Sequence, residues 1–121
     1  GEPTSAPQLD DHTIIVYGSG GGLMSEVNWA QRVGRDDRPP RKAAFSINNI
    51  FAMVRAVEAG LGIAALPDYM VSGMEGRVRK IIPEEVGPHF DLYFIYPSDL
   101  RRSKRIAAFR DFLTREIADL V

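Results

Sequence analysis

The sequence contains no cysteine and only two histidines, His12 and His89. Without cysteine the chain forms no disulfide, has no thiol nucleophile and cannot build a zinc site on thiolates. Neither histidine has a carboxylate or a second histidine at metal-ligand spacing. We therefore expect no metal site and no other cofactor.

Positive charge is not in excess, and long apolar runs are also missing. The chain has 15 lysines and arginines against 16 aspartates and glutamates, a formal net charge of -1, and so lacks the basic surface of a nucleic-acid-binding domain. No apolar run reaches the roughly 20 residues of a membrane span. We expect a soluble, cytoplasmic chain that has no membrane contact and leaves any DNA contact to another part of the protein.

Length and composition favour one domain. With 121 residues, of which 45% are hydrophobic, the chain is large enough to bury a core. Residues 1–9 begin with glycine and contain the run GEPTSAP. We expect a tag remnant or linker at residues 1–9, and a chain that is a fragment of a longer polypeptide.

Hydrophobic patterning predicts an α/β fold. Apolar or alternating segments predict five strands, at Thr13–Tyr17, Arg41–Ile47, Gly62–Leu66, Val78–Ile82 and Phe90–Tyr96. Apolar residues at a helical period predict two amphipathic helices, at Asn49–Ala59 and Ser103–Leu120. The order strand, helix, strand between residues 41 and 66 is typical of a βαβ unit with parallel strands. The predicted architecture is a mostly parallel sheet with flanking helices.

A glycine-rich loop follows the first predicted strand, in the run YGSGGGL. After the last glycine, Leu23 and Met24 stand where a Walker loop needs lysine and then serine or threonine, and the glycines do not have the spacing of a dinucleotide fingerprint. Two interpretations remain open. The loop either has no ligand, or contacts one through backbone amides at Gly18, Ser19 and Gly20.

No arrangement typical of catalysis is present. The sequence has no G-x-S-x-G elbow to expose a nucleophilic serine, and the adjacent carboxylates Glu84 and Glu85 follow a proline in a predicted turn. We expect no enzymatic activity. The basic residues within 35–42 and 101–105 are interleaved with acids or stand at a helix start, so we interpret them as solvated surface, with an interface as the alternative.

Three polar residues stand where the predicted strand 41–47 passes into the predicted helix 49–59. They are Ser46, Asn48 and Asn49, in the run AFSINNIFAM. Ligands of open parallel sheets bind at the carboxyl ends of strands, and the free N–H groups and dipole of a helix start favour an anion such as a carboxylate. The alternative is that Asn48 merely caps the helix, which is worth about 1 kcal/mol. Both interpretations can hold together.

The order of several segments resembles one family. An apolar helix with a polar start runs into AGLGIAALP, and GRVRKIIPEE, DLYFIYP and SKRIAAFRDFL follow in turn. This ordered set resembles the effector-binding domain of LysR-type transcriptional regulators, over most of residues 10–120. No single segment is diagnostic.

The resemblance implies one half of a type 2 periplasmic-binding-protein-like fold, in which two α/β subdomains enclose a small ligand. Residues 10–98 then correspond to the second subdomain, and residues 99–121 to a helix that crosses back to the first. By position, Ser46 corresponds to a hydroxyl residue that contacts the effector, and Asn48 and Asn49 to the adjoining helix start. The loop 18–22 would face the cleft.

The resemblance also implies a role. An effector with a carboxylate would shift a regulator between DNA-bound states, and DNA would be bound only through a winged helix-turn-helix domain that this sequence does not contain. The predicted helix 103–120 has an apolar face without a partner, so we expect a homo-oligomer or, as the alternative, a helix that folds back on its own chain. The alternative is a solute-binding protein of a transporter with the same fold, and a small enzyme that uses the glycine loop is a third interpretation.

Overall fold

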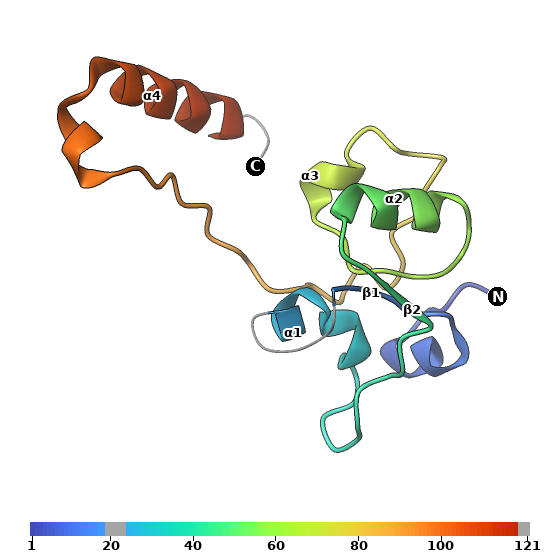
Figure 1. Ribbon diagram of the computed structural model, residues 1–121. Coiled ribbons are helices and arrows are strands. Elements are labelled where there is room, and N and C mark those ends of the chain that lie inside the picture. Colours follow the sequence, from blue (N-terminus) through green and yellow to red (C-terminus); the bar gives the residue numbers. More distant parts are fainter. Residues whose placement is uncertain (19–23, 119–121) are drawn as a thin grey trace. The chain divides into compact units, whose positions relative to one another are not determined.

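The computed structural model describes residues 1–18 and 24–118 and has two compact units, residues 1–88 and residues 89–121. The first contains short 3-10 helices (η), α-helices and strands, labelled in Figure 1: η1 (Ala6–Asp11), β1 (Ile15–Tyr17), α1 (Met24–Val27), η2 (Trp29–Gln31), β2 (Phe45–Ile47), α2 (Ile50–Glu58) and α3 (Asp68–Val71). The second unit contains η3 (Ser98–Arg102) and α4 (Lys104–Ala118).

The strands β1 and β2 form a parallel pair, in which residues 15–17 lie opposite residues 45–47. On its other side, β1 meets the chain at Ile63. The amide of Ile15 donates to the carbonyl oxygen of Ile63 (2.9 Å), and the amide of Ile63 donates to that of Thr13 (2.8 Å). The chain therefore crosses from β2 through α2 to a third parallel segment, with β1 between the two. This confirms an α/β arrangement with parallel pairing.

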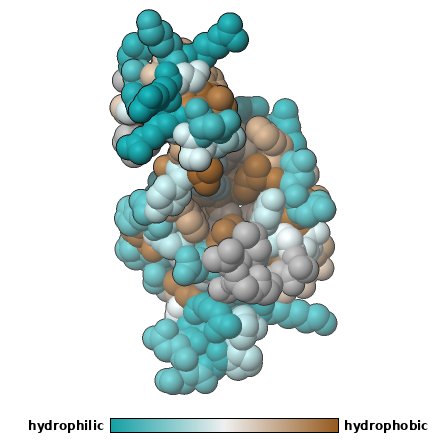
Figure 2. Space-filling view, turned by 60° about the vertical axis from the view of Figure 1, so that its left-hand side comes forward, coloured by the Kyte–Doolittle hydropathy of each residue, from teal (hydrophilic) through white to brown (hydrophobic). Residues whose placement is uncertain are grey.

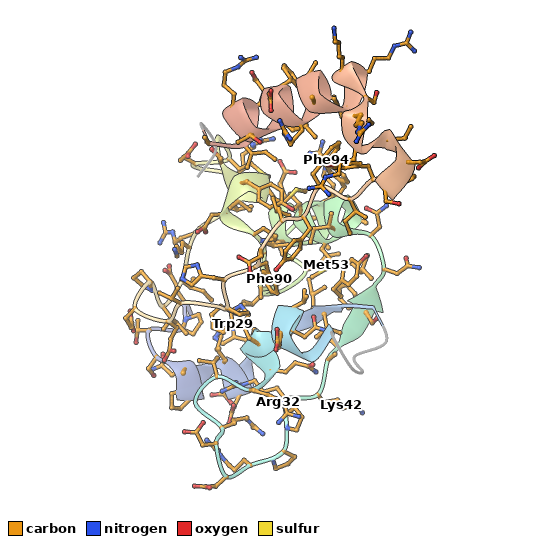
Figure 3. The ribbon with its side chains drawn as sticks, turned by 90° about the vertical axis from the view of Figure 1, so that its left-hand side faces the viewer. Trp29, Arg32, Lys42, Met53, Phe90 and Phe94 are labelled. Carbon is orange, nitrogen blue, oxygen red and sulfur yellow. The ribbon has the colours of Figure 1, made fainter. Side chains whose placement is uncertain are left out.

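Alternation along β1 places apolar side chains on both faces of the pair. Ile14 and Val16 pack on one face with Leu9 and with Ile82. Ile15 packs on the other face with residues of α2, among them Met53, which lies between the helix and the strands in Figure 3. Both faces of β1 are covered, which explains its continuous apolar sequence.

The helix α2 confirms the predicted helix 49–59. It spans Ile50–Glu58, and its inner face buries Met53, Val54 and Ala56. The helix ends where Gly60 adopts a φ of +74°, because a left-handed residue after the last turn stops the α-helical path and glycine adopts it without strain.

Two of the predicted strands in the first unit are wrong. The segment 62–66 reduces to a single bridge between Ile63 and Ile14. The segment 78–82 is not a strand, because the amide of Val78 donates back to Met74 (3.1 Å) in a turn and Ile82 adopts a φ of 48°, which lies outside the strand region. The predicted count of five strands was therefore too high, since β1 and β2 are the only strands of a sheet within the described residues.

Residues 1–9, expected to be a tag remnant or linker, belong to the first unit, where Ala6 and Leu9 are buried. Arg41 holds this segment, since its guanidinium donates to the carbonyl oxygen of Ala6 (2.7 Å) and to the carboxylate of Asp10 (2.7 Å). The side chain of Arg41 is buried, so its interpretation as solvated surface was wrong. The loop 34–40, at the lower end of the unit in Figure 1, has a hydrophilic surface in Figure 2.

The second unit confirms a helix, α4, but not the strand that was predicted before it. Residues 90–96 form no strand, because backbone groups of a strand need a neighbouring strand and the described part of this unit, residues 89–118, offers none. Phe94 instead packs edge-on against Phe109 of α4, with ring centroids 5.7 Å apart, close to the helix in Figure 3. Phe109 and Phe112 remain about half exposed, and the predicted helix end at Leu120 lies outside the described residues.

Candidate functional site

The start of α2 has a side-chain cap and two backbone amides that have no hydrogen-bond partner in the described part of the chain. Asn49, not Asn48, is the capping residue, and its side-chain oxygen accepts from the amide of Ala52 (3.1 Å). The first turn of a helix leaves N–H groups without helical partners. Among the described residues we find no hydrogen bond for the amides of Ile50 and Phe51. These two donors lie at the positive end of the helix dipole, where they favour an anion.

Ser46 and Gly18 lie together where β1 and β2 end. The hydroxyl of Ser46 donates to the carbonyl oxygen of Gly18, and the amide of Gly18 donates to the carbonyl oxygen of Ile47 (3.0 Å). Gly18 adopts a φ of +62°, a backbone conformation that residues other than glycine rarely adopt. The carboxyl ends of the two strands are therefore tied together, with an exposed serine at the junction.

Asn48 lies between the serine and the helix cap. Its side chain is exposed and makes no hydrogen bond within residues 1–18 and 24–118. An amide has two N–H donors and a carbonyl acceptor, and none of these groups of Asn48 is used by the described residues. Of the predicted loop residues, Gly18 is brought to this edge, whereas Ser19 and Gly20 lie outside the described residues.

Asn28 supports the same edge and was missed by sequence reasoning. Its side chain is buried, accepts from the amide of Tyr17 (2.8 Å) and donates to the carbonyl oxygen of Tyr17 (2.9 Å). The backbone of Ile15, two residues earlier, bonds to Ile63 on this side of β1. The side-chain amide of Asn28 thus pairs with the backbone of Tyr17 in the way a neighbouring strand would, beyond the point where the segment at Ile63 pairs with β1. The only sequence signal was an asparagine beside the single tryptophan, in VNWA.

A second group of charged side chains, centred on the carboxylate of Asp10, lies outside this edge. Asp10 contacts Arg35, Arg38 and Arg41 at 2.8, 3.4 and 2.7 Å. The hydrogen bond from Arg35, together with the charges of Arg41 and Arg35, holds the pKa of Asp10 below its usual range, although desolvation opposes the shift. The cluster joins η1 to the loop before β2, so we assign it a structural role.

The described ranges offer neither a metal cluster nor a membrane helix. Within residues 1–18 and 24–118, no group of three or more acidic residues or histidines is placed to hold a metal ion. Nor does that part of the chain contain a helix long and apolar enough to cross a membrane.

The structure therefore places polar side chains at the carboxyl edge of a parallel pair, the edge at which ligands of open α/β sheets bind. Comparison with known proteins identifies the family. The family model described as the LysR substrate binding domain matches residues 1–118, and the chain belongs to this family. The match includes the nine residues expected to be a linker.

A curated relative supports the same assignment. The chain is 28% identical over 101 residues to an uncharacterized HTH-type transcriptional regulator of Haemophilus influenzae. The alignment covers 81% of this chain and 34% of the relative, so the chain spans about a third of that protein. Neither comparison favours the transporter interpretation. No solved structure matches the chain at a significant level.

Proposed function

We propose that the chain senses a small effector for a LysR-type DNA-binding regulator, and that the effector carries a carboxylate. Its proposed site is the edge formed by Ser46, Asn48, Asn49 and Gly18, with the loop residues Ser19 and Gly20. The observation that carries the proposal is the pair of amides at Ile50 and Phe51, which have no partner within residues 1–18 and 24–118, in a chain of this family.

The chemistry of this edge favours an anion. Two backbone N–H groups at a helix start can bind the two oxygens of one carboxylate, and the free amide of Asn48 adds donors. Asn49 orients the helix start through its cap and does not have to contact the ligand itself. The proton of Ser46 is engaged by Gly18, so the serine reaches an anion only if its hydroxyl rotates away from that carbonyl oxygen.

The larger architecture is also a proposal. Residues 10–98 correspond to the second subdomain of a type 2 periplasmic-binding-protein-like domain, and residues 99–121 to the helix that crosses to the first subdomain. Two features of the second unit support this view. Phe109 and Phe112 remain about half exposed although Phe94 packs on Phe109, and the apolar segment 90–96 pairs with no strand in the described part of its unit. We propose further that the regulator is a homo-oligomer and that it contacts DNA through a winged helix-turn-helix domain outside this chain.

The proposed site is tested by calorimetric titration of the full-length regulator with a panel of small carboxylates. In Asn49→Asp the helix cap is kept, because aspartate and asparagine cap equally well, but a negative charge is added beside the ligand. We expect affinity to fall about tenfold, or roughly 1.4 kcal/mol. Ser46→Ala should also weaken binding, whereas Ser72→Ala, an exposed serine after α3, should not.

Unchanged affinity in both Asn49→Asp and Ser46→Ala would remove this edge from the binding site. Tighter binding of neutral amides than of the matching carboxylates would contradict the proposed anion chemistry. Circular dichroism of each variant separates a lost contact from a lost fold, since Asn49→Asp is expected to keep its helix content.

A further inference from the structure

A groove in the first unit lies beside α2 and α3, and the proposed effector site does not include it. Its volume is about 300 Å³, at the lower end of the range for sites that bind small molecules. Neither Ser46 nor Asn48 nor Asn49 lines it. The lining residues are Phe51, Val54, Arg55, Tyr69, Met70, Met74 and Arg77.

The floor and sides of this groove are apolar. Val54 and Met74 are buried in the floor, whereas Phe51 and Tyr69 are 68% and 57% exposed. Two exposed aromatic rings next to buried aliphatic side chains leave apolar surface that a ligand would remove from water. Met70 adds a flexible side chain that adapts to the shape of a ligand.

The guanidinium groups of two arginines line the groove, and both donate hydrogen bonds to the same carboxylate. Glu58 accepts from Arg55 (2.7 Å) and from Arg77 (3.0 Å), with one nitrogen of each arginine engaged. These partners hold the pKa of Glu58 below its usual range, the hydrogen bond from Arg55 being the largest cause. The group of three therefore carries one net positive charge, and most of the N–H donors of both arginines remain available.

Together these features describe a site for one class of ligand. Apolar walls favour a hydrocarbon or aromatic body, and the excess positive charge favours an anionic head. Both arginine side chains are mostly exposed, at 74% and 54%, so a ligand in the groove can reach their remaining N–H groups. We propose that this groove binds a small amphipathic anion, such as an aliphatic or aromatic carboxylate, as a second site beside the proposed effector site. The two sites share only Phe51, whose side chain lines the groove and whose amide lies at the start of α2.

The test uses octanoate as the probe and the uncharged octanamide as its matched control, with binding followed by amide chemical shifts of the 121-residue chain. Octanoate should bind with a dissociation constant on the order of 1 mM, as expected for a ligand of its size. Shift changes are expected at residues 52–55 and 69–77. Octanamide should bind about tenfold more weakly, because it lacks the charge that the arginines attract.

Variants separate the groove from the rest of the surface. Arg77→Gln should weaken octanoate about tenfold and leave octanamide unchanged, and Arg77→Lys should retain most of the affinity. Arg79→Gln is the matched control, because it also breaks an exposed ion pair, with Glu2 (2.7 Å), but does not line the groove. Ser46→Ala should leave octanoate binding unchanged, so failure of the effector site and failure of this proposal are distinguishable.

Several results would overturn the proposal. Equal affinities for octanoate and octanamide would exclude the electrostatic part of the proposal, and shift changes centred on residues 46–51 would place the ligand at the proposed effector site instead. Equal losses of octanoate affinity in Arg77→Gln and Arg79→Gln would show that the affinity depends on general surface charge and not on the groove. If light scattering showed that Phe51→Ser converts a dimer to a monomer and octanoate did not bind, the groove would be an interface between copies instead.

Discussion

Asn28 offers a direct test of how the sheet edge is held. In Asn28→Ala the amide and the carbonyl oxygen of Tyr17 both lose their side-chain partner, at 2.8 and 2.9 Å. Leaving a buried backbone group unpaired costs about 1 to 3 kcal/mol. Tyr17 is only half-buried, so the lower part of that range applies to each group. We expect Asn28→Ala to lower the free energy of unfolding by about 2 to 3 kcal/mol, a large fraction of the total for a small domain.

The assay is urea unfolding followed by the fluorescence of Trp29, the only tryptophan of the chain, which reports on the first unit. The matched control is Asn48→Ala, the same chemical change at an exposed side chain that has no partner among the described residues. It should stay within about 0.5 kcal/mol of the parent. The reasoning is refuted if the two variants unfold at the same urea concentration.

Two further predictions concern the Asp10 cluster and Gly62. The pKa of Asp10 is lowered by Arg35 and Arg41, so its contribution to stability is complete above the usual carboxyl pKa and is lost as the pH falls through the lowered value. Urea midpoints measured between about pH 5 and pH 2 should therefore fall more steeply for the parent than for Asp10→Asn, and equal slopes would contradict this. A Cβ added at Gly62 would lie 2.6 Å from the carbonyl oxygen of Thr13, which accepts from Ile63; Gly62→Ala should cost roughly 1 to 3 kcal/mol. A loss below about 0.5 kcal/mol in the same urea assay would mean that the backbone relaxes freely there.

Local patterns predicted the helices better than the strands. The helical spacing of apolar residues predicted both α2 and α4 to within a residue or two at their described ends, because a helix satisfies its backbone within its own segment. A strand depends on a neighbour that local sequence does not specify. The apolar run 90–96 resembles a strand, but no described segment of its own unit pairs with it.

The candidate site was predictable to a similar extent. The polar cluster at the end of β2 was visible in the sequence, and the capping role fell to Asn49 rather than Asn48. Asn28 and Arg41 were not recognised, because their partners are distant in the chain: Tyr17 lies 11 residues from Asn28, and Ala6 lies 35 residues from Arg41. Such contacts depend on tertiary packing, and a single sequence carries little trace of them.

The central place of β1 has a consequence for synthesis of the chain. Its neighbours, β2 and the segment at Ile63, both come later in the sequence, the second by about 50 residues, so at roughly 5 to 20 residues per second a ribosome needs roughly 3 to 10 s to supply it. Throughout this interval the apolar run at Ile14, Ile15 and Val16 lacks its neighbour at Ile63. Until α2 has been synthesised, it also lacks the helix that covers one of its faces. The nascent chain, before α2 has emerged, is therefore the form in which β1 is most open to chaperones and to aggregation.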